Sequence, residues 1–179
     1  MFLTMQVAAP APRDRTRVML GGALYGLLML IGAILFFFFI LLDLFSANSP
    51  GSYLYYMIIA AVVAFPAVAV YLLVPILIDR YDPEPWWALL GAFAWGGIVG
   101  CGFSGWINSI IGSLASSLGE TAGTIAGAVI SAPIVEEFWK GAFIALLFFF
   151  LRREFDGVVD GLIYAVFAAL GFAAVENIL

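Results

Sequence analysis

Three glutamates lie inside apolar stretches that are long enough to cross a membrane. Glu136 and Glu137 are adjacent in the segment A-P-I-V-E-E-F-W-K-G, and Glu176 lies in the next stretch, in G-F-A-A-V-E-N. A charged carboxylate costs about 2.5–3.5 kcal/mol at the centre of a membrane helix, so ionisable groups there are functional by default. Clustered carboxyls cannot all ionise cheaply, so one can act as a general acid while its neighbour acts as a general base. We therefore expect chemistry on water inside the bilayer.

The spacing of these residues predicts a single site. Lys140 follows Glu136 by four residues and Glu137 by three, so on a helix its ammonium can reach either carboxylate. Glu136 and Glu176 lie equally far before and after a turn near Asp156, which predicts similar depths in an antiparallel helix pair. The predicted cluster consists of Glu136, Glu137, Lys140, Glu176 and Asn177, with Phe172 on the same helix face as Glu176.

The depth of the site can be estimated from the chain. A helix of 1.5 Å rise per residue puts Glu136 about 24 Å from Arg152, which we expect at the cytoplasmic interface. Glu136 would then lie beyond the midplane, toward the external face. Pro133 lacks an N–H and crowds the carbonyl of Val129, so it either kinks this helix and helps to admit water or is simply tolerated.

Three interpretations of the cluster stay open from the residues alone. It could catalyse hydrolysis, relay a proton or cation in a coupled transporter, or form a structural Glu–Lys ion pair. Metal binding lacks the usual protein ligands, because the chain has no histidine and a single cysteine, Cys101, which we interpret as a small buried apolar residue.

Composition indicates an all-α, polytopic membrane helix bundle. The 179 residues are 65% hydrophobic and 11% charged, against about 45–50% and about 25% in soluble domains. The bilayer is therefore a partner, and the scattered acidic residues and short basic cluster do not predict nucleic-acid binding. Five transmembrane helices are predicted, each long enough to span the bilayer: Val18–Leu44, Tyr53–Ile78, Trp86–Ile111, Thr121–Leu151 and Gly157–Leu179.

The distribution of arginines predicts a cytoplasmic N-terminus. Cytoplasmic loops carry an excess of Lys and Arg. Six arginines flank the predicted spans, all on one side of the membrane: Arg13, Arg15, Arg17, Arg80, Arg152 and Arg153. We therefore expect a disordered cytoplasmic tail over residues 1–17, a membrane domain over 18–179, and external loops at 45–52 and 112–120.

Rows of small residues predict close helix packing. They recur at every fourth position from Gly119 to Ser131 and from Gly157 to Ala173, and such rows let helices approach closely in lipid. We expect the fourth and fifth spans to form a tight antiparallel hairpin. Because the fifth span ends on apolar Leu179 without a flanking anchor, we also expect the chain to be an N-terminal fragment, incomplete at its C-terminus.

Two motifs at their spacing resemble the PrsW family of bacterial intramembrane proteases, distant relatives of the CAAX-processing membrane proteases. The first is E-E-F-W-K at Glu136–Lys140, and the second is F-A-A-V-E-N at Phe172–Asn177. An acidic, proline-containing loop at Asp79–Trp86 also resembles the family. For this loop a plain interface role is an alternative, since tryptophans are common at membrane interfaces.

The resemblance implies a multi-pass protease of the bacterial plasma membrane. It implies that Glu136, Glu137 and Glu176 are catalytic, with Lys140, Phe172 and Asn177 in support, and that the substrate is a membrane-anchored protein such as an anti-sigma factor, cut near the external side. The family also places a histidine motif in a later helix. A divalent metal such as zinc would therefore need ligands that this chain lacks, and a complete chain of this length would be a non-catalytic membrane protein. The sequence defines no oligomeric state.

Overall fold

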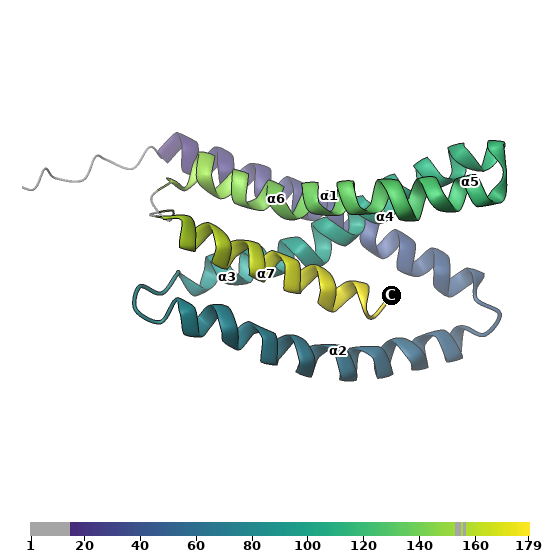
Figure 1. The fold of residues 1–179 in the computed structure, drawn as a ribbon, viewed down its shortest axis with the longest axis horizontal. Coiled ribbons are helices and arrows are strands. Elements are labelled where there is room, and N and C mark those ends of the chain that lie inside the picture. Colours follow the sequence, from purple (N-terminus) through teal and green to yellow (C-terminus); the bar gives the residue numbers. More distant parts are fainter. Residues whose placement is uncertain (1–14, 153–154, 156) are drawn as a thin grey trace, which may run out of the picture.

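The computed structural model describes residues 15–152, 155 and 157–179, which form five helical rods (Figure 1). The first, second and fifth rods are single helices: α1 (Arg15–Ser46), α2 (Pro50–Ile78) and α7 (Val158–Glu176). The third contains α3 (Trp86–Ala94), the π-helix η1 (Trp95–Gly100), α4 (Cys101–Ala115) and the 3₁₀ turn η2 (Ser116–Leu118). The fourth contains α5 (Glu120–Thr124), the π-helix η3 (Ile125–Ser131) and α6 (Ala132–Phe150). The prediction of an all-α fold is confirmed.

Four of the rods are apolar enough to be candidate membrane spans within the described residues. They are α1, α2, the third rod from Trp86 to Leu118, and α7. The fourth rod is comparably long but contains Glu136, Glu137 and Lys140. These three charged residues near its centre distinguish the fourth rod from the other four, which are more apolar.

Most predicted boundaries agree with the helices to within three residues, and one does not. The third span was expected to end at Ile111, but its helix continues to Leu118, and the expected loop at 112–120 is a tight turn. The turn residue Gly119 has φ 124°, a conformation that favours glycine because it has no Cβ. Helix α1 begins at Arg15, inside the expected tail, and residues 1–14 lie outside the described residues.

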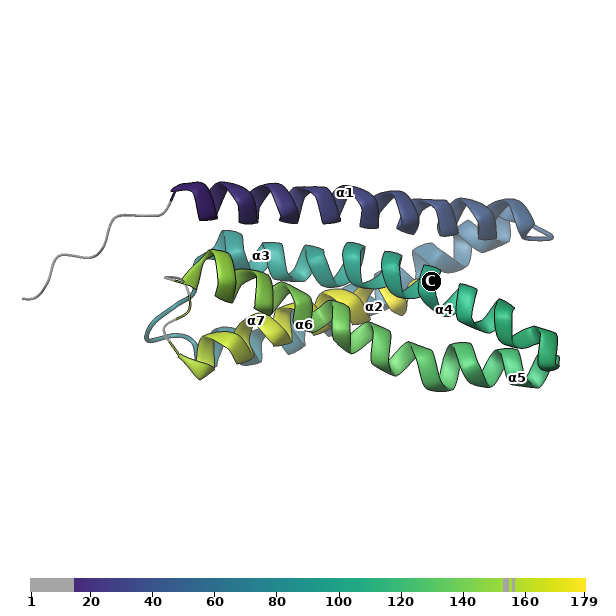
Figure 2. The same cartoon turned by 90° about the horizontal axis from the view of Figure 1, so that it is seen from above.

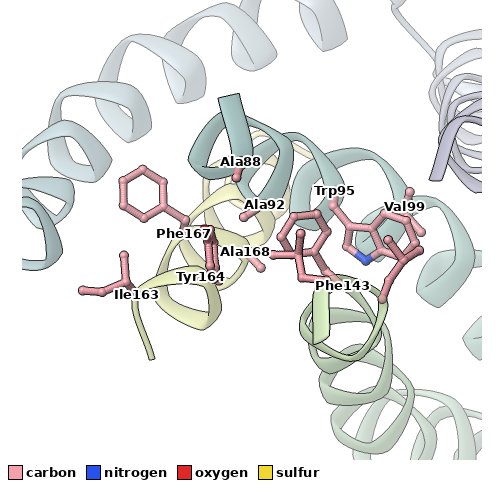
Figure 3. Close-up of a cluster of buried hydrophobic side chains, with 11 residues drawn as sticks. Ala88, Ala92, Trp95, Val99, Phe143, Ile163, Tyr164, Phe167 and Ala168 are labelled. Carbon is pink, nitrogen blue, oxygen red and sulfur yellow. The ribbon is translucent and has the colours of Figure 1, made fainter. Parts of the chain in front are cut away.

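The third rod lies at the centre of the bundle. In its most apolar window 56% of residues are buried, against 6% for α1 and 11% for α2. Its side chains pack with those of α6 and α7 in one hydrophobic core (Figure 3). In that core the rings of Trp95 and Phe143 have centroids 5.8 Å apart, and the Trp95 indole donates a hydrogen bond to the carbonyl of Trp139 at 2.7 Å. This bond fixes α6 against the third rod three residues from Glu136.

The fourth and fifth spans are antiparallel neighbours that contact each other at Lys140 and Phe172, but their expected tight packing is wrong, because both pack most closely on the third rod. A Cβ at Gly96 would lie 1.8 Å from the carbonyl oxygen of Ala168, and one at Gly171 would lie 2.0 Å from that of Phe93. A Cβ at Gly127 would likewise lie 3.0 Å from the carbonyl oxygen of Asn108 in α4. Gly127 of the predicted fourth-span row therefore meets the central rod, whereas Ala165 and Ala169 of the predicted fifth-span row line a hollow beside α6.

Helix α7 lies between the fourth rod and α2 (Figure 1), and α1 covers another side of the central rod (Figure 2). The start of α1, the α2–α3 loop, the end of α6 and the start of α7 share one end of the bundle. The described arginines Arg15, Arg17, Arg80 and Arg152 are in or directly next to these segments. All four therefore gather at one end, as the orientation prediction requires.

Candidate active site

Helix α6 carries the paired glutamates at its beginning. The fourth rod changes from π-helix to α-helix between Ser131 and Ala132, so Pro133 is the second residue of α6. The rod is continuous here, because the N–H of Ala132 donates to the carbonyl of Gly127 in the π-helix, but Pro133 has no N–H with which to continue this pattern. Pro133 thus marks a change of helix type, and Glu136 follows one turn later.

Lys140 connects the two carboxylates, as its spacing predicted. Its Nζ lies 2.8 Å from Oε1 of Glu137 and 3.8 Å from Oε2 of Glu136. The lysine side chain is 17% exposed, so it points into the bundle. Its Nζ also lies 4.2 Å from the ring centroid of Phe172, which is buried in α7. The ammonium is therefore held by two carboxylates and an aromatic face from two helices.

The adjacent glutamates differ in their surroundings. The Glu136 side chain is 20% exposed, whereas that of Glu137 is 74% exposed. Glu136 therefore faces the interior of the bundle and Glu137 the periphery. Together with Lys140, Glu137 lines a hollow of about 280 Å³ between α6 and α7. The pair thus offers one sheltered carboxylate and one that an incoming molecule can reach.

The end of α7 brings in only part of the second motif. Glu176, the last residue of the helix, is close enough to Glu136 for the two charges to interact, although Glu176 itself is exposed. The Asn177 amide does not join the cluster. Its Nδ2 donates to the carbonyl of Ala173 in its own helix at 2.7 Å, and the same carbonyl also accepts the backbone N–H of Asn177 at 3.1 Å.

Cys101 is a member of the cluster that the sequence interpretation missed. Its thiol is within electrostatic range of Glu176, Glu136 and Lys140, and Sγ donates to the carbonyl of Phe172 at 3.7 Å. The signal in the sequence is the glycine-rich W-G-G-I-V-G before it, which permits close approach of another helix. The partner helix could not be read from that pattern.

A second acidic group lies at the opposite end of α7, outside the spans. The hydroxyl of Tyr164 donates to the Glu84 carboxylate, and the Glu84 N–H donates to Oδ2 of Asp79 at 2.7 Å. Burial raises the pKa of Glu84 to about 7, and the carboxylates of Asp160 and Asp79 add to this rise, while the Tyr164 hydrogen bond opposes it. These contacts attach the α2–α3 loop to α7. Trp86, next to the loop, is exposed, as expected of an interface tryptophan.

The sequence of this chain matches a known protein family over the region that contains the cluster. The family model described as "PrsW family intramembrane metalloprotease" matches residues 84–179, more than half of the chain. The chain belongs to the PrsW family. The match includes the paired glutamates, Lys140, Phe172 and Glu176.

A curated PrsW relative aligns with part of this PrsW-family chain. It is Protease PrsW of Geobacillus kaustophilus (strain HTA426), which is 44% identical over 50 residues. The alignment covers 28% of this chain and 22% of the relative. No solved structure matches the chain.

The family description implies a metal, but the side chains that the structure describes do not form a metal site. Within the described residues, no group of three His, Cys, Asp or Glu side chains is placed to hold an ion. The cluster brings together carboxylates and one thiol, with an ammonium between two of the carboxylates. Such a donor set lacks imidazole, and its lysine already occupies the space between Glu136 and Glu137. We therefore assign no catalytic step to a metal.

Proposed function

We propose that this protein is an intramembrane endopeptidase that cleaves a membrane-anchored protein near the external side of the bacterial plasma membrane. The observation that carries the proposal is the cluster of Glu136, Lys140 and Glu176 within a matched PrsW region. A membrane-anchored anti-sigma factor is a suitable substrate class, as the family resemblance implies. Membership of a protease family favours hydrolysis over coupled transport.

Glu136 serves as the general base. It is the sheltered carboxylate, and a base in a site of low dielectric can take a proton from a water molecule that it holds. The water oxygen attacks the carbonyl carbon of the scissile peptide bond, and the C–O bond forms as the proton passes to Glu136. Lys140, 3.8 Å from Glu136, offsets the negative charge that develops on the substrate oxygen.

Collapse of the tetrahedral intermediate breaks the C–N bond and needs a proton on the leaving nitrogen. The protonated Glu136 supplies it, so the base of the first step becomes the acid of the second. Glu137 holds Lys140 in place at 2.8 Å and borders the hollow from which a substrate would approach. Glu176 adds a second carboxylate near Glu136.

The hollow between α6 and α7 is the route by which we expect a substrate helix to reach the site. Besides Glu137 and Lys140 it is lined by small and aliphatic side chains: Gly141, Ile144, Ala165, Val166 and Ala169. Small residues let a third helix approach the backbone closely. An extended substrate segment next to such a helix would pass the exposed carboxylate of Glu137 before it reached Glu136.

In this proposal all five rods cross the bilayer, with the N-terminus in the cytoplasm. The support is the gathering of Arg15, Arg17, Arg80 and Arg152 at one end of the bundle. The fourth rod crosses despite its charges because Lys140 pairs with Glu136 and Glu137, and paired ionisable groups facing the bundle interior are tolerated. The external end is then the end with the turn at Gly119.

A cleavage assay tests the proposal. We expect the full-length protein to cut a membrane-anchored reporter, and Glu136→Gln to slow the cut by about 10²–10⁴-fold, the usual contribution of a general base, while leaving the amount of folded protein unchanged. Glu120→Gln is the matched control, because Glu120 is an exposed residue at the start of α5. Full cleavage by Glu136→Gln would contradict the proposal. A proton flux in liposomes that is lost in Glu176→Gln, without any cleavage, would favour the transporter.

A further inference from the structure

An apolar hollow lies near the arginine end of the bundle, where α1, α3 and α6 meet (Figure 2). Its volume is about 200 Å³, and it shares no lining residue with the hollow between α6 and α7. Its lining includes Gly21, Gly22 and Tyr25 of α1, Gly91 of α3, and Leu147 and Leu151 of α6. Gly22 leaves part of this space open, because an added Cβ would have no neighbouring atom of the described residues within 4 Å. We call this space the α1–α3–α6 hollow.

The chemistry of the α1–α3–α6 hollow suits a hydrocarbon chain better than water. Its lining consists of glycine, alanine, leucine and aromatic residues. The Tyr25 hydroxyl already donates to the carbonyl of Gly91 at 3.2 Å, so its hydrogen is not available to another ligand. An apolar cavity of about 150 Å³ stays dry and is large enough to bind benzene. The hollow, at about 200 Å³, can therefore take a section of an acyl chain.

The side of α1 that lines this hollow also carries two arginines. Arg15 precedes Gly22 by seven residues and Arg17 precedes Gly21 by four, so each arginine shares a helix face with its glycine. Both arginines are exposed. At 1.5 Å per residue, they lie about 6–10 Å beyond the two glycines along the helix. A lipid whose phosphate lies at these arginines therefore has its acyl chains at the depth of the hollow.

Charge distinguishes this hollow from a second apolar hollow at the same end of the bundle. The second hollow lies between α2 and α7, and its lining includes Ile78 and Leu162. Asp79 directly follows Ile78, and Asp160 precedes Leu162 by two residues, so carboxylates lie beside it. In contrast, Arg152 directly follows the last lining residue of the α1–α3–α6 hollow. An anionic headgroup is therefore favoured beside α1 and disfavoured beside the acidic residues.

We propose that the α1–α3–α6 hollow binds one acyl chain of an anionic phospholipid, whose phosphate is held by Arg15 and Arg17. Guanidinium groups bind phosphate oxygens through paired hydrogen bonds, and basic pockets between membrane helices bind anionic headgroups. The bound lipid connects the start of α1 with α3 and with α6, the helix that carries Glu136. The inference goes beyond the proposed function, because the site needs no proteolysis.

Native mass spectrometry of the purified protein tests the headgroup part of the site, because it resolves single bound lipids. The Kd of the first bound lipid is measured for dioleoylphosphatidylglycerol, which is anionic, and for dioleoylphosphatidylcholine, which has no net charge. We expect the anionic lipid to bind more tightly, by about fivefold for each of the two arginines. The double variant Arg15→Gln/Arg17→Gln should lose this preference. Arg80→Gln, which removes an arginine beside the acidic hollow, is the matched control and should keep it.

Filling the hollow tests the acyl-chain part of the site. Gly22→Leu should weaken the binding of both lipids by about tenfold, because the leucine side chain takes the place of part of the acyl chain. Gly26→Leu is the matched control. Gly26 lies one turn further along α1 and also has no neighbouring atom of the described residues within 4 Å of an added Cβ, but it does not line the hollow. If Gly22→Leu does not fold, Gly22→Ala adds one carbon and should weaken binding by about fourfold.

Two results would overturn the lipid site. The first is equal affinity of the wild type for the two lipids, because the arginines would then select no headgroup. The second is equal lipid affinity in the Gly22 and Gly26 variants, because the acyl chain would then lie outside the hollow. Neither result bears on the proposed function, since no step of the test needs cleavage.

Discussion

The ammonium of Lys140 lies 4.2 Å from the ring centroid of Phe172, and this contact joins the first motif of the cluster to the second. Lys140 is on α6 and Phe172 on α7, so the contact sets how the two helices meet at the site. A cation over an aromatic face contributes about 0.5–1 kcal/mol when exposed and about 2 kcal/mol when desolvated. The aromatic ring therefore helps to keep Lys140 beside Glu136 and Glu137.

Replacing this ring should impair cleavage more than folding. We expect Phe172→Leu to lower kcat roughly 5- to 30-fold, because Lys140 is no longer held in position. This loss corresponds to about 1–2 kcal/mol of transition-state stabilisation. Phe167→Leu is the control, because it makes the same substitution at another buried phenylalanine of α7. Reporter cleavage and the thermal midpoint in detergent are measured for both. Equal kcat losses in the two variants would remove the specific role of Phe172.

The α2–α3 loop should give the protein a pH-dependent stability. The pKa of Glu84 is raised from its ordinary 4.5 to about 7, chiefly by burial. A carboxyl with a raised folded-state pKa binds its proton more tightly in the folded state. Its contribution to stability is thus fully present below about pH 4.5 and is lost as the pH rises through 7. We therefore expect the thermal midpoint, measured in detergent, to decrease as the pH is raised from 5 to 8.

The variant Glu84→Gln separates this effect from other titrations. The amide stays neutral and can still accept the hydrogen bond from Tyr164. We expect its thermal midpoint to vary less with pH than that of the wild type, whereas Glu120→Gln, which also removes one acidic group, should follow the wild type. Identical pH profiles for Glu84→Gln and the wild type would show that Glu84 keeps its ordinary pKa.

The close approach of α7 to the central rod should make Gly96 intolerant of substitution. An added Cβ would lie 1.8 Å from the Ala168 carbonyl oxygen, and backbone cannot give way as a flexible side chain can. Overpacking of this kind typically costs about 1–3 kcal/mol, so Gly96→Ala should lower the thermal midpoint. Gly91→Ala, in the same rod, has 3.6 Å to the nearest atom and should be tolerated. A wild-type midpoint for Gly96→Ala would contradict the packing.

The sequence predicted the features that depend on one helix at a time. The spacing of Glu136, Glu137 and Lys140 fixes their mutual reach on a helix, and the measured ion pairs agree with it. The helix starts at Trp86 and near Pro50 follow from the prolines in the sequence at or just before each start. These parts need no knowledge of which helices are neighbours.

The main missed features of the packing and of the site depend on which helices are neighbours. Rows of small residues mark a helix face that can pack closely, but they do not name its partner, so the central position of the third rod was not predicted. For the same reason the position of Cys101 was not predicted. Cys101 reaches the cluster only because Gly96 and Gly100 let the third rod approach α7 closely. The π-helices η1 and η3 also lack a local sequence signature.

The central claim is that Glu136 and Glu176 belong to one catalytic unit. A double-mutant cycle of Glu136→Gln, Glu176→Gln and the double variant in the full-length protein tests it, with kcat/KM for reporter cleavage as the measured quantity. Residues that act as a unit have strongly non-additive effects, so we expect the double variant to lose about as much activity as the more damaging single variant. Losses that multiply, or full activity in Glu176→Gln, would contradict a shared site.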